Sequence, residues 1–279
     1  MSRKRIVIKV GTSTLTHENG EMNLRSFEKL ARVLSDVQNM GYEVILVSSG
    51  AIAVGASRLR MPERPQELRL KQAAAAVGQC ELMHLYDKFF SEYGKIVAQI
   101  LLTGDDVHDP DIKLNLISTF NALLELGILP IVNENDSVSY AEIEAPAPDI
   151  ESAADRPHTA HKVFGDNDTL SAVVAALCRA DLLVLLSDVD GLYDSDPKYN
   201  PDAQLIRLVP KLDESIFALA GGAGSNRGTG GMITKLKAAE IAVAEGIDMV
   251  ITDGSEPSNL YDILEGKEVG TLFIGQKEG

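Results

Sequence analysis

Short apolar runs alternate with longer helical patterns along most of the chain, and this alternation constrains the fold most strongly. Runs rich in Val, Ile and Leu predict strands at 5–10, 43–48, 96–102, 128–132, 182–186 and 247–252, and an edge strand at 270–274. Apolar residues at helical spacing predict helices at 24–40, 67–93, 112–126, 170–178, 235–244 and 260–265. Strands separated by helices favour parallel βαβ units. The sequence therefore predicts an α/β fold with helices on both faces of a mostly parallel sheet.

The domain organisation is predicted to be simple. The chain has 279 residues, of which 45% are hydrophobic and 24% are charged, as is typical of a globular protein with a substantial core. No internal repeat or linker divides it, so residues 1–279 are expected to form one domain. Residues 143–163 contain three prolines, several acids and few apolar side chains. We expect a mobile insertion there.

Charge and hydropathy exclude several classes of partner. The formal net charge is −15, which argues against binding to nucleic acid or to an anionic membrane. No stretch approaches 18 consecutive apolar residues, and the apolar run behind the basic start is too short for a signal peptide. A cytoplasmic protein is expected. The two cysteines, Cys80 and Cys178, lie in apolar helical patterns and are expected in the core.

Polar and glycine-rich clusters follow the predicted strands. They occupy residues 9–13, 48–53, 133–136 and 187–188, and a further cluster at 165–168 precedes a predicted helix. Each alone is compatible with an ordinary turn, because Gly, Asn, Asp and Ser form turns for local reasons. Together they are expected at the carboxyl ends of the strands, where ligands of parallel sheets gather.

Two lysines and one aspartate suggest an anion site. Lys9 interrupts an apolar strand, either as a snorkelling edge residue or as a cation placed over a phosphate. The segment Gly-Thr-Gly-Gly-Met-Ile-Thr-Lys at 228–235 enters a helix and ends in Lys235, although its spacing is not that of a P-loop. Asp168 is either a helix N-cap or an acid that aligns these two lysines.

These motifs, in this order, resemble the glutamate 5-kinases of the amino acid kinase family. The resemblance rests on Lys-Val-Gly-Thr-Ser at 9–13, Ser-Ser-Gly-Ala-Ile-Ala-Val-Gly at 48–55, Asn-Glu-Asn-Asp at 133–136, Gly-Asp-Asn-Asp at 165–168 and the segment at 228–235. Asp-Pro-Lys-Tyr-Asn-Pro at 196–201 also resembles a loop near the nucleotide in that family. The match extends from near residue 5 to near residue 275. It implies an open three-layer αβα sandwich.

The resemblance also implies roles for single residues. The catalytic residues would be Lys9, Lys235 and Asp168. The substrate would be held by Ser49, Gly50, Asn133, Asp136 and Asn167. The nucleotide would be held by Lys9, Gly11, Ser187, Asp188, Thr229, Gly230, Gly231, Met232, Ile233, Thr234 and Lys235. The resemblance implies Mg²⁺ bound with ATP. The acidic residues between 188 and 196 could suggest a Ca²⁺ site, but they lack EF-hand spacing because Gly191 falls too early.

The implied activity is ATP-dependent phosphorylation of the side-chain carboxylate of L-glutamate, the first step of proline biosynthesis. A carboxylate is already ionised at neutral pH, so the reaction requires no general base. The resemblance implies a homo-oligomer, and glutamyl phosphate reductase is a candidate partner. The resemblance covers the kinase domain, and we expect no counterpart of the C-terminal RNA-binding-type domain that many members of the family carry. Two alternatives stay open: another carboxylate kinase of the family, and a non-catalytic sensor of nucleotide or amino acid.

Overall fold

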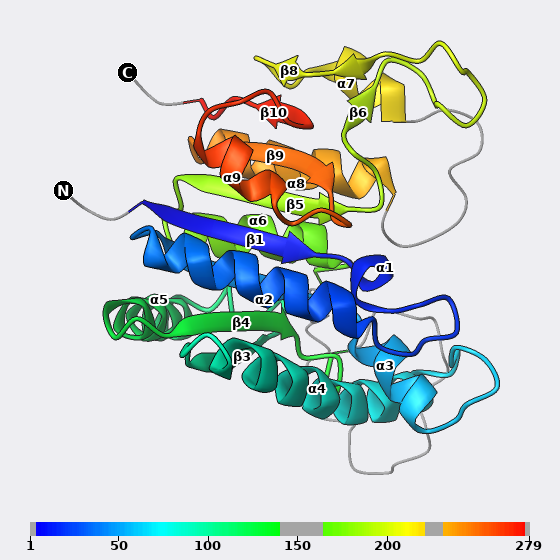
Figure 1. Cartoon of the computed structure of the whole chain (residues 1–279), viewed down its shortest axis with the longest axis vertical. Helices are drawn as coiled ribbons and strands as arrows, with labels where there is room; N and C mark the ends of the chain where they lie inside the picture. The colour runs from blue at the N-terminus through cyan, green and yellow to red at the C-terminus, as the bar shows by residue number, and fades with distance from the viewer. Residues whose placement is uncertain (1–3, 140–163, 221–230, 277–279) are drawn as a thin grey trace, which may run out of the picture.

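A computed structural model describes residues 4–139, 164–220 and 231–276, which form an eight-stranded sheet between layers of helices (Figure 1). The strand order is β3-β4-β2-β1-β5-β9-β10-β8. In chain order the strands span Arg5–Val10 (β1), Glu43–Ser48 (β2), Val97–Leu102 (β3), Leu129–Glu134 (β4), Leu182–Ser187 (β5), Leu208–Val209 (β8), Asp248–Asp253 (β9) and Thr271–Phe273 (β10). The strands from β3 to β9 are parallel, whereas β10 runs antiparallel to β9.

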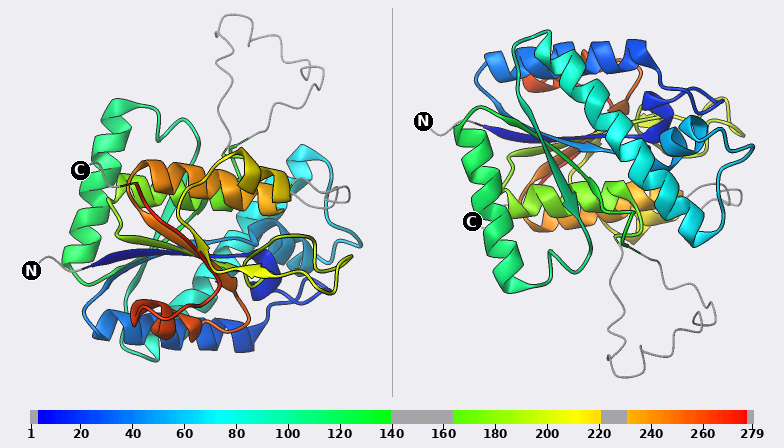
Figure 2. Two further views of the ribbon diagram at one scale, coloured as in Figure 1. Left: turned by 90° about the horizontal axis from the view of Figure 1, so that it is seen from above. Right: turned by 90° about the horizontal axis from the view of Figure 1, so that it is seen from below.

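The helices cover both faces of this sheet (Figure 2). One face carries α2 (Leu24–Asn39), α4 (Leu68–Ser91) and α9 (Asn259–Leu264). The opposite face carries α5 (Pro110–Glu125), α6 (Asn167–Leu177) and α8 (Met232–Ala244). The arrangement confirms the predicted three-layer αβα sandwich, and it leaves the carboxyl ends of the parallel strands at one edge.

Alternation along the strands decides which helical layer each terminal side chain faces. In β1, Ile6 and Ile8 pack against the layer of α2 and α4, whereas Val7 packs against that of α6 and α8. Successive strand residues point to opposite faces, so Lys9 shares the face of Val7. By the same rule Asn133, at the end of β4, faces α4, whereas Glu134 faces α6.

A short helix that the sequence pattern did not predict lies beside the site. Helix α3 (Ala51–Arg58) follows β2 directly and crosses α4 at two glycines. A Cβ atom added to Gly55 would lie 1.8 Å from the carbonyl oxygen of Ala74, and one added to Gly78 would lie 1.8 Å from that of Ala51. Glycine at both positions therefore permits the two helix backbones to approach, which ties the start of α3 to α4.

Most predicted elements are present with ends shifted by at most three residues, and Asn23 caps α2 as expected, since its side chain accepts a hydrogen bond from Ser26 N. Two predictions are wrong. The strand at the chain end, β10, is not an edge strand, because it lies between β9 and β8. Cys80 is exposed on α4, whereas Cys178 is buried.

Short elements complete the described part of the chain. They are α1 (Thr12–Leu15), α7 (Glu214–Ala220) and the antiparallel pair β6 (Leu192–Tyr193) and β7 (Leu205–Ile206). The predicted insertion at 143–163 lies outside the described residues. None of the helices in the described ranges combines the length and apolar content needed to cross a bilayer.

Candidate functional site

The carboxyl ends of β1, β2, β4 and β5 bring the predicted polar clusters to one edge of the sheet. Lys9, Ser48, Glu134 and Ser187 are the last or next-to-last residues of these strands. All four are buried, at 8% exposure or less. Helices α6 and α8 begin over the same edge and add side chains from the layer above.

Three charged side chains form a buried cluster in which Asp168 lies between two lysines. Lys9 Nζ is 2.6 Å from Asp168 Oδ1, and Lys235 Nζ is 3.3 Å from Asp168 Oδ2. Asp168 is only 1% exposed and Lys235 3%. The lysine of β1 and the lysine at the start of α8 thus meet through one carboxylate of α6. The structure brings together all three residues to which the sequence assigned catalysis.

Neighbouring groups keep the carboxylate of Asp168 in its charged form. Burial acts to raise the pKa of Asp168, but the charges of Lys9 and Lys235 and hydrogen bonds from Lys9 and Thr234 outweigh it and lower the pKa. Asp168 is therefore ionised, and two lysines beside one aspartate give the cluster a formal charge of +1. An anion beside the lysine side chains would be attracted to this excess positive charge.

The N-cap of α6 differs from the predicted alternative, and the start of α8 lies close to it. Asp166 is the N-cap of α6, and its Oδ1 accepts a hydrogen bond from Thr169 N at 2.8 Å. Asp168 lies in the first turn, so the N-cap alternative for this residue is wrong. At the start of α8, Gly231 is the N-cap, and Thr234 Oγ1 lies 2.9 Å from Asp168 Oδ2 and 2.7 Å from Gly231 O.

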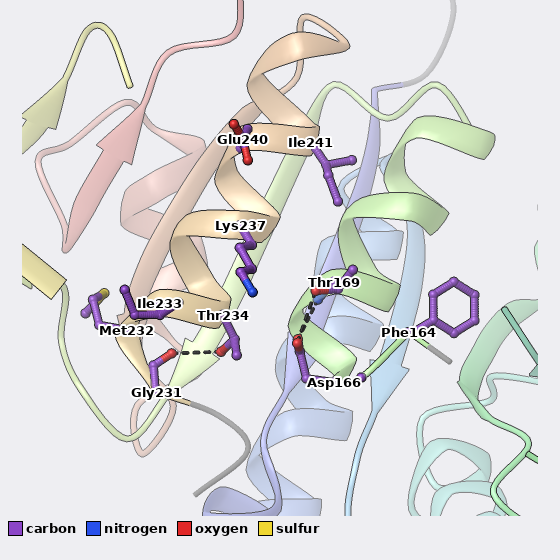
Figure 3. A pocket seen from close by; sticks show the side chains of 11 residues that line it. Phe164, Asp166, Thr169, Gly231, Met232, Ile233, Thr234, Lys237, Glu240 and Ile241 are labelled. Carbon is purple, nitrogen blue, oxygen red and sulfur yellow. Dashed lines mark hydrogen bonds between the residues drawn. The ribbon is translucent and has the colours of Figure 1, made fainter. Parts of the chain in front are cut away.

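A pocket of about 650 Å³ opens on the solvent side of these two helix starts. In Figure 3, Thr234 and Lys237 from α8 and Asp166 and Thr169 from α6 point into the space between the helices. Predicted nucleotide-binding residues Gly231, Met232 and Ile233 also line it. The pocket does not contain Lys9, Asp168 or Lys235, which lie on the sheet side of the same helices.

Amide groups connect β2, β4 and α6 on the other side of the cluster. Asn167 Nδ2 lies 2.9 Å from Ser48 O, 2.9 Å from Ser49 Oγ and 3.0 Å from Asn133 Oδ1. Three of the predicted substrate-binding residues are therefore joined in one network. A participant that the sequence did not indicate is Gln79 of α4, whose Oε1 accepts a hydrogen bond from Asn133 Nδ2 at 2.9 Å.

The turn between β2 and α3 presents backbone donors to the same space. Gly50 has φ of +100°, a left-handed conformation that favours glycine, and it is the N-cap of α3 without a side-chain cap. Beneath the turn, Ser48 Oγ lies 2.8 Å from the hydroxyl of buried Tyr86 and donates to Ser49 O at 3.2 Å. This contact ties the turn to α4.

Three further carboxylates gather near the end of β4, and none of the lysines in the described part of the chain lies between them. Burial, reinforced by the charge of Asp136, raises the pKa of Glu134 to about 7. Burial raises the pKa of Asp136 to about 6, although the charge of Arg64 opposes the shift. The pKa of Asp166 is also raised, chiefly by burial. Such a group attracts a cation.

The structure describes only some of the remaining residues that were predicted to bind the nucleotide. Ser187 ends β5, and its hydroxyl donates to Asp188 Oδ1 at 2.9 Å. Gly11 follows β1, and a Cβ atom there would lie 3.7 Å from Lys9 Nζ. Both positions border the lysine cluster from the strand side. Thr229 and Gly230 lie outside the described residues.

A sequence model described as the amino acid kinase family matches residues 4–253, which is most of the chain. The chain belongs to the amino acid kinase family. Curated relatives of this amino acid kinase include the glutamate 5-kinase of Clostridium perfringens, which is 54% identical over 98% of this chain and 96% of that protein. The glutamate 5-kinase of Listeria innocua is 51% identical over 99% of this chain and 94% of that protein.

Solved structures agree with the fold of this amino acid kinase. Carbamate kinase from Giardia lamblia, bound to AMP-PNP, has a TM-score of 0.65 and 18% identity, with 99% of each chain covered. UMP kinase from Bacillus anthracis has a TM-score of 0.63 and 18% identity, with 99% of this chain and 98% of that chain covered. At such identity the likeness supports the fold alone, and the expected three-layer architecture agrees with it.

Proposed function

We propose that this chain transfers the γ-phosphoryl group of ATP to the side-chain carboxylate of L-glutamate, giving L-glutamyl 5-phosphate for proline biosynthesis. The glutamate 5-kinases that resemble it over nearly its whole length support this activity. The observation within the molecule that carries the proposal is the buried cluster of Lys9, Asp168 and Lys235. A carboxylate nucleophile needs positioning and charge neutralisation, and this cluster provides both.

Each member of the cluster has a distinct task in the transfer. Lys9 reaches the reacting groups from the sheet and Lys235 reaches them from α8, so they approach the transferred phosphoryl group from two sides. Asp168 contacts both amino groups and holds their separation. Because the lysines are fixed before ATP binds, little reorganisation accompanies the build-up of charge on the phosphoryl oxygens.

The amino acid would lie between this cluster and the end of β4. Its side-chain carboxylate must face the lysines, where the Gly50 turn and Ser49 offer donors. Its α-ammonium group would be held by the carboxylates of Asp136 and Asp166, which lack a lysine partner among the described residues. The site thus separates an anion-accepting side from a cation-accepting side, as a zwitterionic substrate requires.

Mg²⁺ would enter with the nucleotide. Within residues 4–139, 164–220 and 231–276, no three His, Cys, Asp or Glu side chains are grouped to hold a metal ion. Mg²⁺ keeps several waters and is bound mainly through phosphate oxygens with one or two carboxylates. Asp188, exposed at the end of β5, is the carboxylate placed to assist. When bound, the ion would neutralise charge on the phosphates.

The direct test is formation of an acyl phosphate. Purified protein, ATP and Mg²⁺ are incubated with hydroxylamine and one acceptor from a panel of glutamate, N-acetylglutamate, aspartate and carbamate. Hydroxamate formation with glutamate above the other acceptors is expected. Turnover of another acceptor alone would reject the glutamate assignment, whereas ATP binding without any turnover would reject catalysis.

We also propose that copies of the chain assemble through the edge of the sheet at β3. Apolar side chains near this edge are exposed, with Ile96 at 66%, Leu114 at 66% and Leu126 at 75%. Exposed apolar side chains beside an open strand favour association. A monomer in light-scattering measurements at micromolar concentration would contradict this proposal.

The remaining assignments follow from the proposed reaction. ATP and glutamate are cytoplasmic metabolites, which supports a cytoplasmic enzyme. The acyl phosphate product is reactive, so glutamyl phosphate reductase is the partner that would consume it. Residues 1–279 would act as one domain, since β10 lies beyond the matched residues but belongs to the same sheet. Limited proteolysis that released a stable, independently folded half would contradict this organisation.

A further inference from the structure

The backbone groups that contact the side-chain amides of this network show which end of each amide is oxygen and which is nitrogen. Asn133 Oδ1 accepts a hydrogen bond from Glu134 N at 2.9 Å, and a backbone N–H can only donate. The other end of that amide is therefore the donor Nδ2, which faces Gln79. It follows that Gln79 presents its oxygen to Asn133 and directs its own Nε2 elsewhere.

The same reasoning applies to Asn167. Its Nδ2 faces the carbonyl oxygen of Ser48, which can only accept, so the amide orientation of Asn167 is also fixed. Ser49 Oγ accepts from this Nδ2, which leaves the Ser49 hydroxyl hydrogen free to donate. The network therefore has donors pointing outward at Ser49 and Gln79.

Gln79 Nε2 is an unused donor at the edge of the site. It forms no hydrogen bond with any described residue, and it is not sealed from solvent. The residue itself is partly buried on α4, next to the Gly78 crossing that fixes this helix against α3. The donor is thus presented from a rigid element, as a group that selects a ligand should be.

The place of this donor in the sheet indicates which substrate group it meets. Strand β2 lies between β1 and β4, so the ends of β1 and β4 are about 10 Å apart. Lys9 marks the β1 side, where phosphoryl transfer would occur. Gln79 lies with Asn133 on the β4 side, where Asp136 would hold the α-ammonium group. The group beside an α-ammonium in an amino acid is the α-carboxylate, which requires a donor.

We propose that Gln79 is a specificity-determining residue that donates a hydrogen bond from Nε2 to the α-carboxylate of the amino acid substrate. This inference rests on the proposed function, because it assigns a part of the same acceptor site. It accounts for a polar side chain of α4 that reaches the ends of β2 and β4 without using its own donor.

Two variants of Gln79 distinguish hydrogen-bond donation to the substrate from positioning of Asn133. Gln79→Glu keeps an oxygen to accept from Asn133 but replaces the free donor by an acceptor. Gln79→Met removes both groups at similar volume. Gln276→Glu is the matched control, since it adds the same charge at an exposed position after β10, away from the acceptor site and from the β3 edge. The acceptors are L-glutamate and L-isoglutamine, in which a neutral amide replaces the α-carboxylate.

For Gln79→Glu we expect the glutamate KM to rise about 10- to 100-fold with kcat within a few-fold of wild type, as for loss of a hydrogen bond to a charged group. The ratio of kcat/KM for glutamate to that for isoglutamine should fall by a similar factor, because the α-amide of isoglutamine can donate a hydrogen bond to the carboxylate introduced at position 79. Gln79→Met should raise the glutamate KM about tenfold, and Gln276→Glu should leave both KM values unchanged.

A normal glutamate KM in Gln79→Glu, whatever Gln79→Met shows, would overturn the inference, because the residue would then only position Asn133. An unchanged preference between glutamate and isoglutamine would overturn it as well. Wild-type protein that forms no hydroxamate from glutamate would instead reject the proposed function. Thermal unfolding and ATP binding verify that each variant is folded.

Discussion

Two groups of carboxylates lie at the same edge of the sheet, and their surroundings give them opposite properties. Asp168 contacts two lysines, and its pKa is lowered despite burial. Glu134, Asp136 and Asp166 have no lysine beside them among the described residues, and burial raises the pKa of each. Asp166 and Asp168 are separated by one residue, yet they belong to different groups.

This difference shows that two features decide which charged side chains meet at this site. One is the face of the sheet to which a strand residue points, and the other is the position of a residue at the start of α6. Lys9 faces α6 because it shares the face of Val7, and the first turn of α6 directs Asp168 toward it. Asp166 caps the same helix from outside the turn, lines the pocket between α6 and α8, and adds its charge to the effects that raise the pKa of Glu134. An anion-binding side and a cation-binding side therefore arise within one short segment. The predictions below test this division.

The largest expected effect concerns the anion-binding side. Lys235→Ala should lower kcat about a thousandfold, because the lost charge acts on the transferred phosphoryl group, while the glutamate KM changes only a few-fold. Steady-state kinetics at saturating ATP provide the measurement. Lys267→Ala is the control, since it removes an exposed lysine that pairs with Asp262 and Glu265 on α9 and near its end. A kcat near that of wild type in Lys235→Ala would contradict the assigned role.

A smaller effect is expected on the cation-binding side as pH is lowered. Asp136 binds an ammonium group only when ionised, and its pKa is raised to about 6. The glutamate KM should therefore rise about tenfold as pH falls from about 8 to about 5. In Asp136→Asn the KM should be high throughout and its pH dependence should weaken. Identical pH profiles for the variant and the wild type would contradict this assignment.

The smallest effect concerns stability. The pKa of Glu134 rises from 4.5 to about 7 on folding, so its contribution to stability is greatest below 4.5 and is lost as pH rises through about 7. Glu134→Gln should accordingly raise the free energy of unfolding by about 2 kcal/mol at pH 8 and have little effect near pH 4.5. Urea titrations at both pH values give the comparison. An equal gain in the free energy of unfolding at both pH values would contradict the raised pKa of Glu134.

The anion-binding side could be predicted from the sequence, because its residues violate local patterns. Lys9 interrupts an apolar strand, and the glycines before Lys235 are unusual at a helix start. The order of the motifs then identified the family. No pattern of this kind marked Gln79, which has the ordinary spacing of a helical residue and is distinguished only by its contact with Asn133.

Other features depended on tertiary contacts. Glu134 sits within a recognised motif, but its raised pKa results from burial beside Asp136 and Asp166 in three dimensions. The position of β10 was mispredicted because the two-residue strand β8, which covers its outer side, is too short to produce a sequence signal. Helix α3 was missed because it is only eight residues long and begins at a glycine in the left-handed conformation.

The central position of β1 has a consequence for how the chain is made. The strand is synthesised before the other strands of the sheet, pairs with β2 on one side, and needs β5 on the other. Until residues 182–187 have left the ribosome, one edge of β1 has no partner and can pair with another nascent chain. The cluster of Lys9, Asp168 and Lys235 cannot assemble before α8, which carries Lys235, has been synthesised. A truncated translation product would thus be inactive and prone to aggregation, and folding must wait for the last third of the protein.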